Sequence, residues 1–232
     1  MEKQKYAAIV LAAGSGKRMN SKVHKQYLII QDRPVLYYSL KAFEDSAVDE
    51  IVLVVGKGEE KFCRKEIVDK YGISKVKAIV EGGKERYHSV FEGLKQTSDA
   101  DYVLIHDGAR PFVNQDIIRR CMQEVQKYQA CVVGMPVKDT IKIADEEGYA
   151  KQTPDRKNVW MIQTPQTFSY ALIYEAYEEM LKTEDAAITD DAMVLERTEG
   201  KKSKLIEGSY RNIKITTPED LLIANVYLQH PE

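Results

Sequence analysis

The stretch Ala8–Met19, AIVLAAGSGKRM, decides the fold. Its first half is apolar, which is typical of a strand that is covered on both faces of a parallel sheet. Its second half has glycines followed by two cations, and glycines allow backbone N–H groups to approach phosphate oxygens closely. Because ligands in open α/β sheets bind beyond the carboxyl ends of strands, the stretch predicts an α/β protein with a phosphate site at its first strand.

Short apolar runs alternate with amphipathic stretches along the rest of the chain. The expected strands are Tyr6–Ala12, Glu50–Val55, Val76–Val80, Tyr102–His106, Ala130–Met135, Val159–Gln163 and Lys204–Ile206. The expected helices are Val35–Phe43, Glu59–Tyr71, Tyr87–Gln96, Gln115–Tyr128, Ala171–Lys182 and Pro218–Leu228. This alternation predicts a mostly parallel sheet flanked by helices, and 232 residues suit a single domain over residues 1–232.

One stretch, residues 138–168, interrupts the alternation. Short β-like pieces at Thr140–Ala144 and Val159–Gln163 flank a polar turn at Asp145–Gly148. We therefore expect a β-hairpin arm that projects from the main sheet. An isolated two-stranded arm is marginal in water, so we also expect the arm to pack on a two-fold-related subunit as a dimerisation arm.

The charge balance argues against a large polyanionic partner. Basic residues number 34 and acidic residues 36, for a net charge of −2, so we expect neither nucleic acid nor a membrane surface as a partner. No apolar run approaches the ~20 residues of a membrane span and none resembles a signal peptide, so we expect a cytoplasmic protein. The cysteines, Cys63, Cys121 and Cys131, have no CxxC spacing and are expected to be free thiols.

The glycine turn fits neither familiar phosphate fingerprint. A dinucleotide GxGxxG and a Walker A loop would both need glycine at position 19, which is Met19. The remaining pattern is A-A-G-x-G-x-R-M, followed by a lysine-rich segment in which Lys25 precedes Gln-Tyr-Leu. Arg18 and Lys25 would supply positive charge to a phosphate. The alternative on this stretch alone is a surface turn with solvated cations.

Six further blocks narrow the interpretation. They are EGGKERYHSV at 81–90, VLIHDGARPF at 103–112, VKDTIK at 137–142, IQTPQTF at 162–168, TDDA at 189–192 and GSYRNIKITTPEDL at 208–221. Together with the glycine turn, in this order and spacing, they resemble the family of 2-C-methyl-D-erythritol 4-phosphate cytidylyltransferases, which are sugar-phosphate nucleotidyltransferases with a Rossmann-like fold. The resemblance covers essentially the whole chain.

The resemblance implies an activity. CTP and 2-C-methyl-D-erythritol 4-phosphate would give 4-diphosphocytidyl-2-C-methyl-D-erythritol and pyrophosphate, by in-line attack of the substrate phosphate on the α-phosphorus. Such chemistry depends on positioning and on cations aimed at the phosphorus. The resemblance assigns this role to Arg18, Lys25 and Lys214. From its alternating apolar neighbours alone, Lys214 would be an outward-facing strand lysine.

Asp107 follows the strand YVLIH where the chain leaves the sheet. The resemblance implies that its carboxylate holds Mg²⁺, or another divalent cation, against the triphosphate. From the sequence alone, an Asx turn or a helix cap is an equal alternative. The preceding His106 is expected to be a packed residue at the strand end.

The resemblance also implies which residues bind the nucleotide: Ala12, Ala13, Gly14, Gly16, Gly82, Gly83, Ser89 and Asp107. Backbone groups and a hydroxyl can read the polar edge of cytosine, and close glycine packing leaves too little room for a purine. Arg86 is expected to brace this loop rather than to contact nucleotide.

The sugar-phosphate side is implied to use Arg110, Thr140, Arg156 and Thr164, with the arm of one subunit serving the partner's site in a homodimer. Arg156 would clamp the incoming phosphate with two hydrogen bonds, and its alternative is a solvated loop arginine. Asp190–Asp191 is either a helix N-cap pair or part of the wall for the substrate hydroxyls. His24 stands where the family usually has proline, and the loop is expected to be more mobile before CTP binds.

Three other functions fit parts of this sequence less well. Ribitol-5-phosphate cytidylyltransferases share most blocks but tend to carry Ser-Val in place of Gly108–Ala109 and to lack the double aspartate of TDDA. A non-catalytic nucleotide sensor would be expected to lose Lys25, Asp107 or Lys214, and all three are present. An NAD-dependent oxidoreductase would need the third glycine of GxGxxG, where this chain has Met19, and an acidic residue after the second strand.

Overall fold

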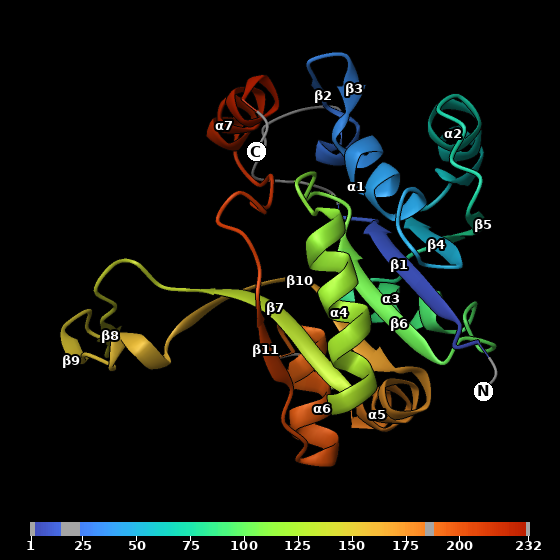
Figure 1. Cartoon of the computed structure of the whole chain (residues 1–232). Coiled ribbons are helices and arrows are strands. Elements are labelled where there is room, and N and C mark those ends of the chain that lie inside the picture. The colour runs from blue at the N-terminus through green and yellow to red at the C-terminus, as the bar shows by residue number, and fades with distance from the viewer. Residues whose placement is uncertain (1–2, 15–23, 184–187, 231–232) are drawn as a thin grey trace.

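A computed structural model describes residues 3–14, 24–183 and 188–230, and it shows a seven-stranded sheet with helices on both faces (Figure 1). The strands of this sheet are β1 (Tyr6–Ala12), β4 (Glu50–Val55), β5 (Val76–Glu81), β6 (Tyr102–Asp107), β7 (Ala130–Pro136), β10 (Trp160–Ser169) and β11 (Lys204–Glu207). Their order is β11-β7-β10-β6-β1-β4-β5. Strand β10 is antiparallel to both neighbours and the other pairs are parallel. The expected α/β class with a mostly parallel sheet is confirmed.

The helices are α1 (Val35–Glu44), α2 (Glu60–Cys63), the π-helix η3 (Arg64–Asp69), α3 (Arg86–Leu94), α4 (Gln115–Tyr128), α5 (Tyr170–Thr183), α6 (Asp191–Glu199) and α7 (Pro218–Gln229). Short elements are the 3₁₀ turns η2 (Lys25–Tyr27) and η4 (Arg156–Asn158) and the two-stranded ribbon of β2 (Ile29–Ile30) and β3 (Arg33–Pro34). Helix α4 has the predicted bounds because its ends are well marked. Asn114 accepts a hydrogen bond from the backbone N–H of Ile117 at 3.0 Å, and Gln129 ends the helix in the left-handed region. In the described part of the chain, no helix has the length and apolarity to cross a membrane.

The apolar strands are explained by two cores, one on each face of the sheet. Along β1, Ala8 and Val10 pack with residues of α1 and α4, whereas Ala7 and Ile9 pack with residues of α3, α5 and α6. All four side chains are fully buried. Successive strand residues point to opposite faces, so a strand that is covered twice needs apolar residues at every position.

The arm differs in part from the expected hairpin. Strand β8 (Ile143–Ala144) pairs antiparallel with β9 (Ala150–Gln152) around the predicted turn. The expected second strand, Val159–Gln163, is not part of this hairpin: it largely coincides with the start of β10, where Trp160–Ile162 pairs with the end of β7. The β10 strand continues to Ser169 within the main sheet, so the projecting part of residues 138–168 is shorter than expected.

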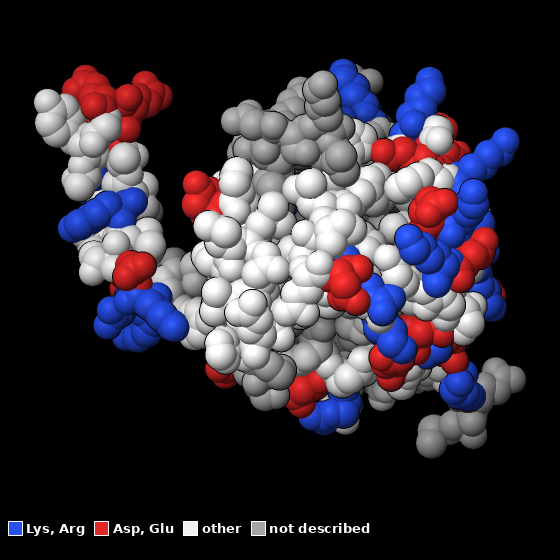
Figure 2. Space-filling model, turned by 90° about the horizontal axis from the view of Figure 1, so that it is seen from above, with Lys and Arg blue, Asp and Glu red and all other residues white. Residues whose placement is uncertain are grey.

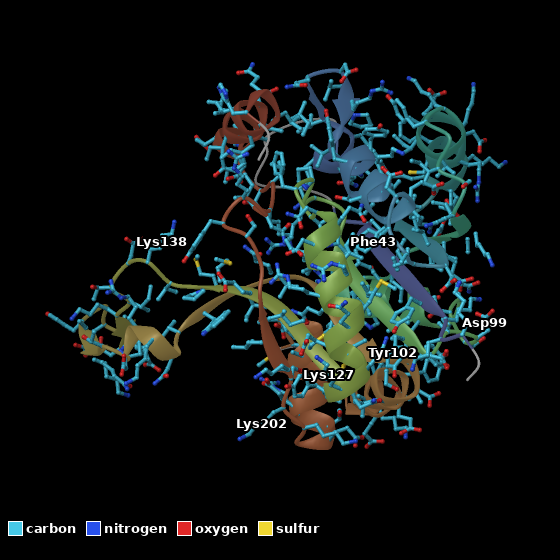
Figure 3. The ribbon with its side chains drawn as sticks, in the orientation of Figure 1. Phe43, Asp99, Tyr102, Lys127, Lys138 and Lys202 are labelled. Carbon is cyan, nitrogen blue, oxygen red and sulfur yellow. The ribbon has the colours of Figure 1, made fainter. Side chains whose placement is uncertain are left out.

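The arm stands clear of the body of the protein (Figures 1 and 2). Figure 3 shows Phe43 inside the body and Lys138 on the arm. Lys138 Nζ lies 3.6 Å from the centre of the Tyr210 ring, a cation–π contact. Apolar side chains remain exposed on the hairpin and beside it, including Tyr149 at 70% and Met161 at 47% exposure.

Candidate active site

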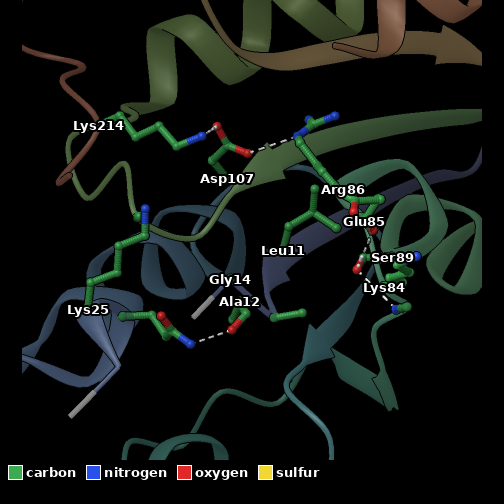
Figure 4. A pocket seen from close by; sticks show the side chains of 14 residues that line it. Leu11, Ala12, Gly14, Lys25, Lys84, Glu85, Arg86, Ser89, Asp107 and Lys214 are labelled. Carbon is green, nitrogen blue, oxygen red and sulfur yellow. Dashed lines mark hydrogen bonds and ion pairs between the residues drawn. The ribbon is translucent and has the colours of Figure 1, made fainter. Parts of the chain in front are cut away.

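The carboxyl ends of the parallel strands surround a cavity of about 370 Å³ (Figure 4). It is lined by Leu11, Ala12, Ala13, Gly14, Lys25, Gln26, Gly83, Lys84, Glu85, Arg86, Ser89, Asp107, Ala109 and Lys214. These residues lie at or just after the ends of β1 and β6, in the loop from β5 into α3, in η2 and in the segment between β11 and α7. This is the position at which open α/β sheets bind their ligands.

Asp107 lies where β6 ends, and three cations surround its carboxylate. Lys214 Nζ is 2.8 Å from Oδ2, Arg86 Nε is 3.4 Å from Oδ1, and Arg110 Nε is 3.7 Å from Oδ2. Burial alone would raise the pKa of Asp107, but the charges of Arg86, Lys214 and Arg110 outweigh it and hold the pKa well below its usual range. Asp107 is therefore an anion fixed among cations.

Arg86 connects Asp107 to the helix α6. Its guanidinium donates two hydrogen bonds, each of 2.8 Å, to the carboxylate of Asp191, which is fully buried. The hydroxyl of Tyr177 donates to the same carboxylate at 2.6 Å. A bidentate pair of this kind fixes the guanidinium plane, with Nε directed at Asp107. Arg86 also lines the cavity, so the expectation that it braces the loop without contacting nucleotide stays a prediction.

His106 and Thr164 support the backbone beneath Asp107. The Asp107 N–H donates to Thr164 Oγ1 at 3.1 Å, Thr164 Oγ1 lies 3.0 Å from His106 Nδ1, and His106 Nε2 lies 3.2 Å from the carbonyl oxygen of Arg110. Burial lowers the pKa of His106 to about 4, so the ring is neutral near pH 7. This assigns the Nε2–H tautomer, which donates to Arg110 and accepts from the Thr164 hydroxyl.

Lys25 and Lys214 approach the cavity from different elements. Lys25 begins η2, whose neighbouring Gln26 donates a 2.5 Å hydrogen bond to the carbonyl oxygen of Ala12 at the end of β1. Lys214 is placed by the next residue, since the Ile215 N–H donates to the carbonyl oxygen of Ala109 at 2.8 Å. Figure 4 shows both lysine side chains directed toward the space next to Asp107.

The opposite wall is the loop between β5 and α3. The Ser89 hydroxyl accepts from the Gly83 N–H at 3.1 Å and donates to the Glu85 carbonyl oxygen at 3.3 Å. A Cβ on Gly82 would lie 2.5 Å from the Cβ of Ala13 and 2.6 Å from Ser89 Oγ. Glycine at 82 therefore allows this loop to close against the turn after β1.

The structure brings together many of the residues predicted from the sequence. Ala12, Ala13, Gly14, Lys25, Gly83, Ser89, Asp107 and Lys214 line the cavity. Gly82 lies directly beside it, and Arg110 and the buried Thr164 lie behind Asp107. Thr140 and Arg156 are on the exposed arm and do not line this cavity. Gly16 and Arg18 lie outside the described residues.

Several residues that line the cavity were not predicted from the sequence. Gln26, Lys84 and Glu85 border the cavity. They stand inside the segments KQYL and EGGKERYHSV, so their proximity to predicted residues was the available signal. The three cysteines are buried and form no disulfide, and burial raises the pKa of Cys63 to about 11 and that of Cys121 to about 12. These thiols are protonated near neutral pH and do not line the cavity.

The acidic residues limit how a divalent cation could bind. Among the described residues, no group of three or more His, Cys, Asp or Glu side chains is arranged as a metal site. Asp107 and Glu85 both line the cavity, on different walls. Mg²⁺ is commonly held by one or two carboxylates together with substrate phosphates, so Asp107 fits a cation that is shared with a phosphate ligand.

Comparison with known proteins identifies a family for this chain. The family model described as 2-C-methyl-D-erythritol 4-phosphate cytidylyltransferase matches residues 6–230. A relative of that name from Lachnoclostridium phytofermentans is 51% identical over 226 residues, which are 97% of this chain and 97% of the relative. A second, from Lachnospira eligens, is 54% identical over 224 residues, with coverage of 96% and 98%.

The similarity extends to solved structures. The 4-diphosphocytidyl-2C-methyl-D-erythritol synthase from Anaerococcus prevotii has a TM-score of 0.86 with this chain at 38% identity, covering 98% of this chain and 97% of that one. The resemblance drawn from the sequence blocks is thereby confirmed over nearly the full length. The chain therefore belongs to the family of 2-C-methyl-D-erythritol 4-phosphate cytidylyltransferases.

Proposed function

We propose that this protein transfers the cytidylyl group of CTP to 2-C-methyl-D-erythritol 4-phosphate, giving 4-diphosphocytidyl-2-C-methyl-D-erythritol and pyrophosphate in non-mevalonate isoprenoid biosynthesis. The observation that carries the proposal is the cavity lined by Lys25, in which Lys214 and Arg86 pair with Asp107, in a chain that belongs to this family. Cations that are already in place need little rearrangement when charge builds up on a reacting phosphorus.

The residues divide between the two substrates. The turn after β1 and the loop from Gly83 to Ser89 form the two walls for the nucleotide, and their close approach suits a pyrimidine. Lys25 and Lys214 neutralise charge at the α-phosphorus during in-line attack by the substrate phosphate. Arg110 donates to the Asn212 carbonyl oxygen at 2.7 Å, and we assign it to the sugar-phosphate substrate.

We propose that a divalent cation binds Asp107 together with phosphate oxygens of CTP. Mg²⁺ is the expected ion, because it is commonly held by one or two carboxylates and substrate phosphates. When bound, it would neutralise phosphate charge and act as a Lewis acid. Lys214 occupies Oδ2 of the same carboxylate, whereas Oδ1 has only the longer contact with Arg86 at 3.4 Å. Asp107 could therefore hold the cation while it stays paired with the lysine.

We also propose a homodimer in which the arm of one subunit completes the site of the other. The proposal is supported by the position of Thr140 and Arg156 on the projecting arm and by the exposed apolar side chains there. Arg156 Nη1 donates to the Lys138 carbonyl oxygen at 2.9 Å, which holds it near the base of the arm. A cytoplasmic location, without nucleic-acid or membrane partners, stays a prediction.

A turnover assay tests the function. Purified protein is incubated with CTP, Mg²⁺ and either 2-C-methyl-D-erythritol 4-phosphate or ribitol 5-phosphate, and pyrophosphate release is measured. We expect efficient release with the first substrate, little with the second, and little when ATP or GTP replaces CTP. Preferred turnover of ribitol 5-phosphate would reassign the substrate, and binding of CTP without any turnover would indicate a sensor.

A further inference from the structure

The turn that carries Lys25 is anchored on both of its flanks. On one side, Gln26 is bonded to the Ala12 carbonyl oxygen, as described above. On the other, His24 and Tyr27 both meet the side chain of Glu59, at the end of the loop between β4 and α2. Lys25 stands between the two residues that contact Glu59.

The contacts of Glu59 are short and come from separate segments. Its Oε2 accepts the Tyr27 hydroxyl at 2.8 Å and the Gly56 N–H at 3.0 Å. Its Oε1 lies 2.7 Å from His24 Nδ1, a close contact that is not aligned as a hydrogen bond. The carboxylate thus joins the Lys25 turn to the end of β4.

The local sequence leaves room for this carboxylate. A Cβ on Gly56 would lie 2.6 Å from Glu59 Oε2, so a larger residue at 56 would displace the side chain. Tyr27 is also held by its own neighbours. Its hydroxyl lies 3.0 Å from Cys63 Sγ, and its ring packs edge-on against Phe62 with the ring centres 5.1 Å apart.

We propose that Glu59 is a positioning residue for Lys25. It does not line the cavity, but it contacts His24 and Tyr27 in the turn that carries the lysine, and so it sets where the ammonium group can stand. The inference rests on the proposed function, in which Lys25 faces the triphosphate. Small displacements of a catalytic group have large effects on rate, because the productive geometry is narrow.

Three variants test the proposal in the full-length protein. Glu59→Ala removes every contact of the carboxylate, and we expect kcat to fall tenfold or more, in line with the ~10²-fold cost of a ~1 Å misplacement. Glu59→Gln keeps an acceptor for Tyr27 and Gly56 and should restore most of the rate. Glu60→Gln removes the adjacent charge, and since Glu60 makes no hydrogen bond to the turn among the described residues, its kcat should be unchanged. An unchanged kcat in Glu59→Ala would overturn the proposal.

A double-mutant cycle separates positioning from general destabilisation. If Glu59 acts through Lys25, then Glu59→Ala should lower the single-turnover rate much less in a Lys25→Ala background than in the wild type. Equal losses in both backgrounds would mean that Glu59 does not act through Lys25. CTP affinity, measured by calorimetry on the same four proteins, gives a second reading of the cycle. If wild-type protein binds CTP without turnover, the proposed function fails while the cycle in affinity still decides the role of Glu59.

Discussion

At the scale of single residues, Asp107 organises the charge of the site. Arg86, Arg110 and Lys214 share its carboxylate, and one of them, Arg86, is also paired with Asp191. These three cations outnumber the two carboxylates that they contact, Asp107 and Asp191. The site therefore has a local positive excess although the whole chain has a net charge of −2, and a triphosphate can bind without a basic protein surface.

The two lysines should be needed for turnover and not for folding. Lys25→Ala and Lys214→Ala are each expected to lower kcat by about 10²–10³-fold, the usual cost of one lost transition-state donor. The melting temperature should change little in Lys25→Ala. In Lys214→Ala, Arg86 and Arg110 still neutralise the Asp107 carboxylate, so the protein should fold with a modest loss of stability. Steady-state kinetics with thermal unfolding checks both effects. A variant that keeps near-wild-type kcat would remove that lysine from the catalytic role.

His106 should make stability fall in mild acid. Its pKa is about 4 in the folded protein and 6.5 for an unperturbed histidine, so the unfolded chain binds more protons between these values. The free energy of unfolding therefore decreases as the pH falls from about 6.5 to about 4, by about 3 kcal/mol in total. Urea unfolding at a series of pH values measures this slope.

The control for this slope is His106→Gln, which does not titrate and should flatten the curve in that window. Asp107 affects the pH dependence of stability in a lower pH range. Because its folded pKa is depressed below 3.8, its share of stability is present above that value and is lost at lower pH. A slope between pH 6.5 and 4 that survives in His106→Gln would assign the proton uptake to another group.

At the scale of elements, the short helix α6 holds a cavity residue in place through a buried ion pair. Its first residue, Asp191, is fully buried and holds Arg86 through two hydrogen bonds. Asp190, the N-cap, accepts from the Met193 N–H at 2.9 Å. Of the two interpretations of Asp190–Asp191, the structure supports the cap for Asp190 and a buried ion pair for Asp191.

Asp191→Asn should destabilise the protein strongly. It leaves the Arg86 guanidinium without its buried anion, and breaking such a pair typically costs about 3–5 kcal/mol. Asp190→Asn is the matched control, since asparagine is also a good N-cap, and about 1 kcal/mol is expected for its weakened contact with Gln166. Urea midpoints compare the two variants. Equal midpoints would show that the pair contributes no more than a surface contact.

Most elements could be predicted because their pattern is local. β1 and β4 have the predicted bounds, since each is an apolar run that is buried on both faces. β10 was predicted only at its beginning. Its later part contains Gln166 and Thr167, which are buried within the sheet. A run of polar residues does not indicate a buried strand unless its distant partners are known.

These distant partners explain why the later part of β10 was not predicted. Gln166 Oε1 accepts from the N–H groups of Asp191 and Ala192 at 3.0 and 2.9 Å, so the strand and α6 satisfy each other. The same holds in the site. The residue types and the glycine loops indicated phosphate chemistry, but the pairing of Arg86 with Asp191 joins positions 105 residues apart. No local pattern in the sequence encodes such a contact.

At the scale of the whole molecule, the arm decides whether the site is shared. If Arg156 acts in the partner's site, mixing inactive Lys25→Ala with inactive Arg156→Ala should restore activity after subunit exchange. Each mixed dimer would have one site with both defects and one with neither. With random exchange about half of the dimers are mixed, so about a quarter of wild-type turnover should return.

The exchange is verified by native mass spectrometry, and each variant incubated alone serves as the control. If verified exchange restored no turnover, Arg156 would act within its own chain, and the arm would be a local flap. Loss of the dimer on removal of residues 143–152 would separately show that the hairpin holds the subunits together.

The cavity also has a consequence for the timing of synthesis. Its walls come from segments far apart in the chain, and Lys214 is made about a hundred residues after Asp107, at roughly 5–20 residues per second. During that interval the growing polypeptide has the segments of both nucleotide walls but lacks the lysine that pairs with Asp107. We therefore expect a nascent chain to be inactive until the last strand, β11, and the segment after it have been made.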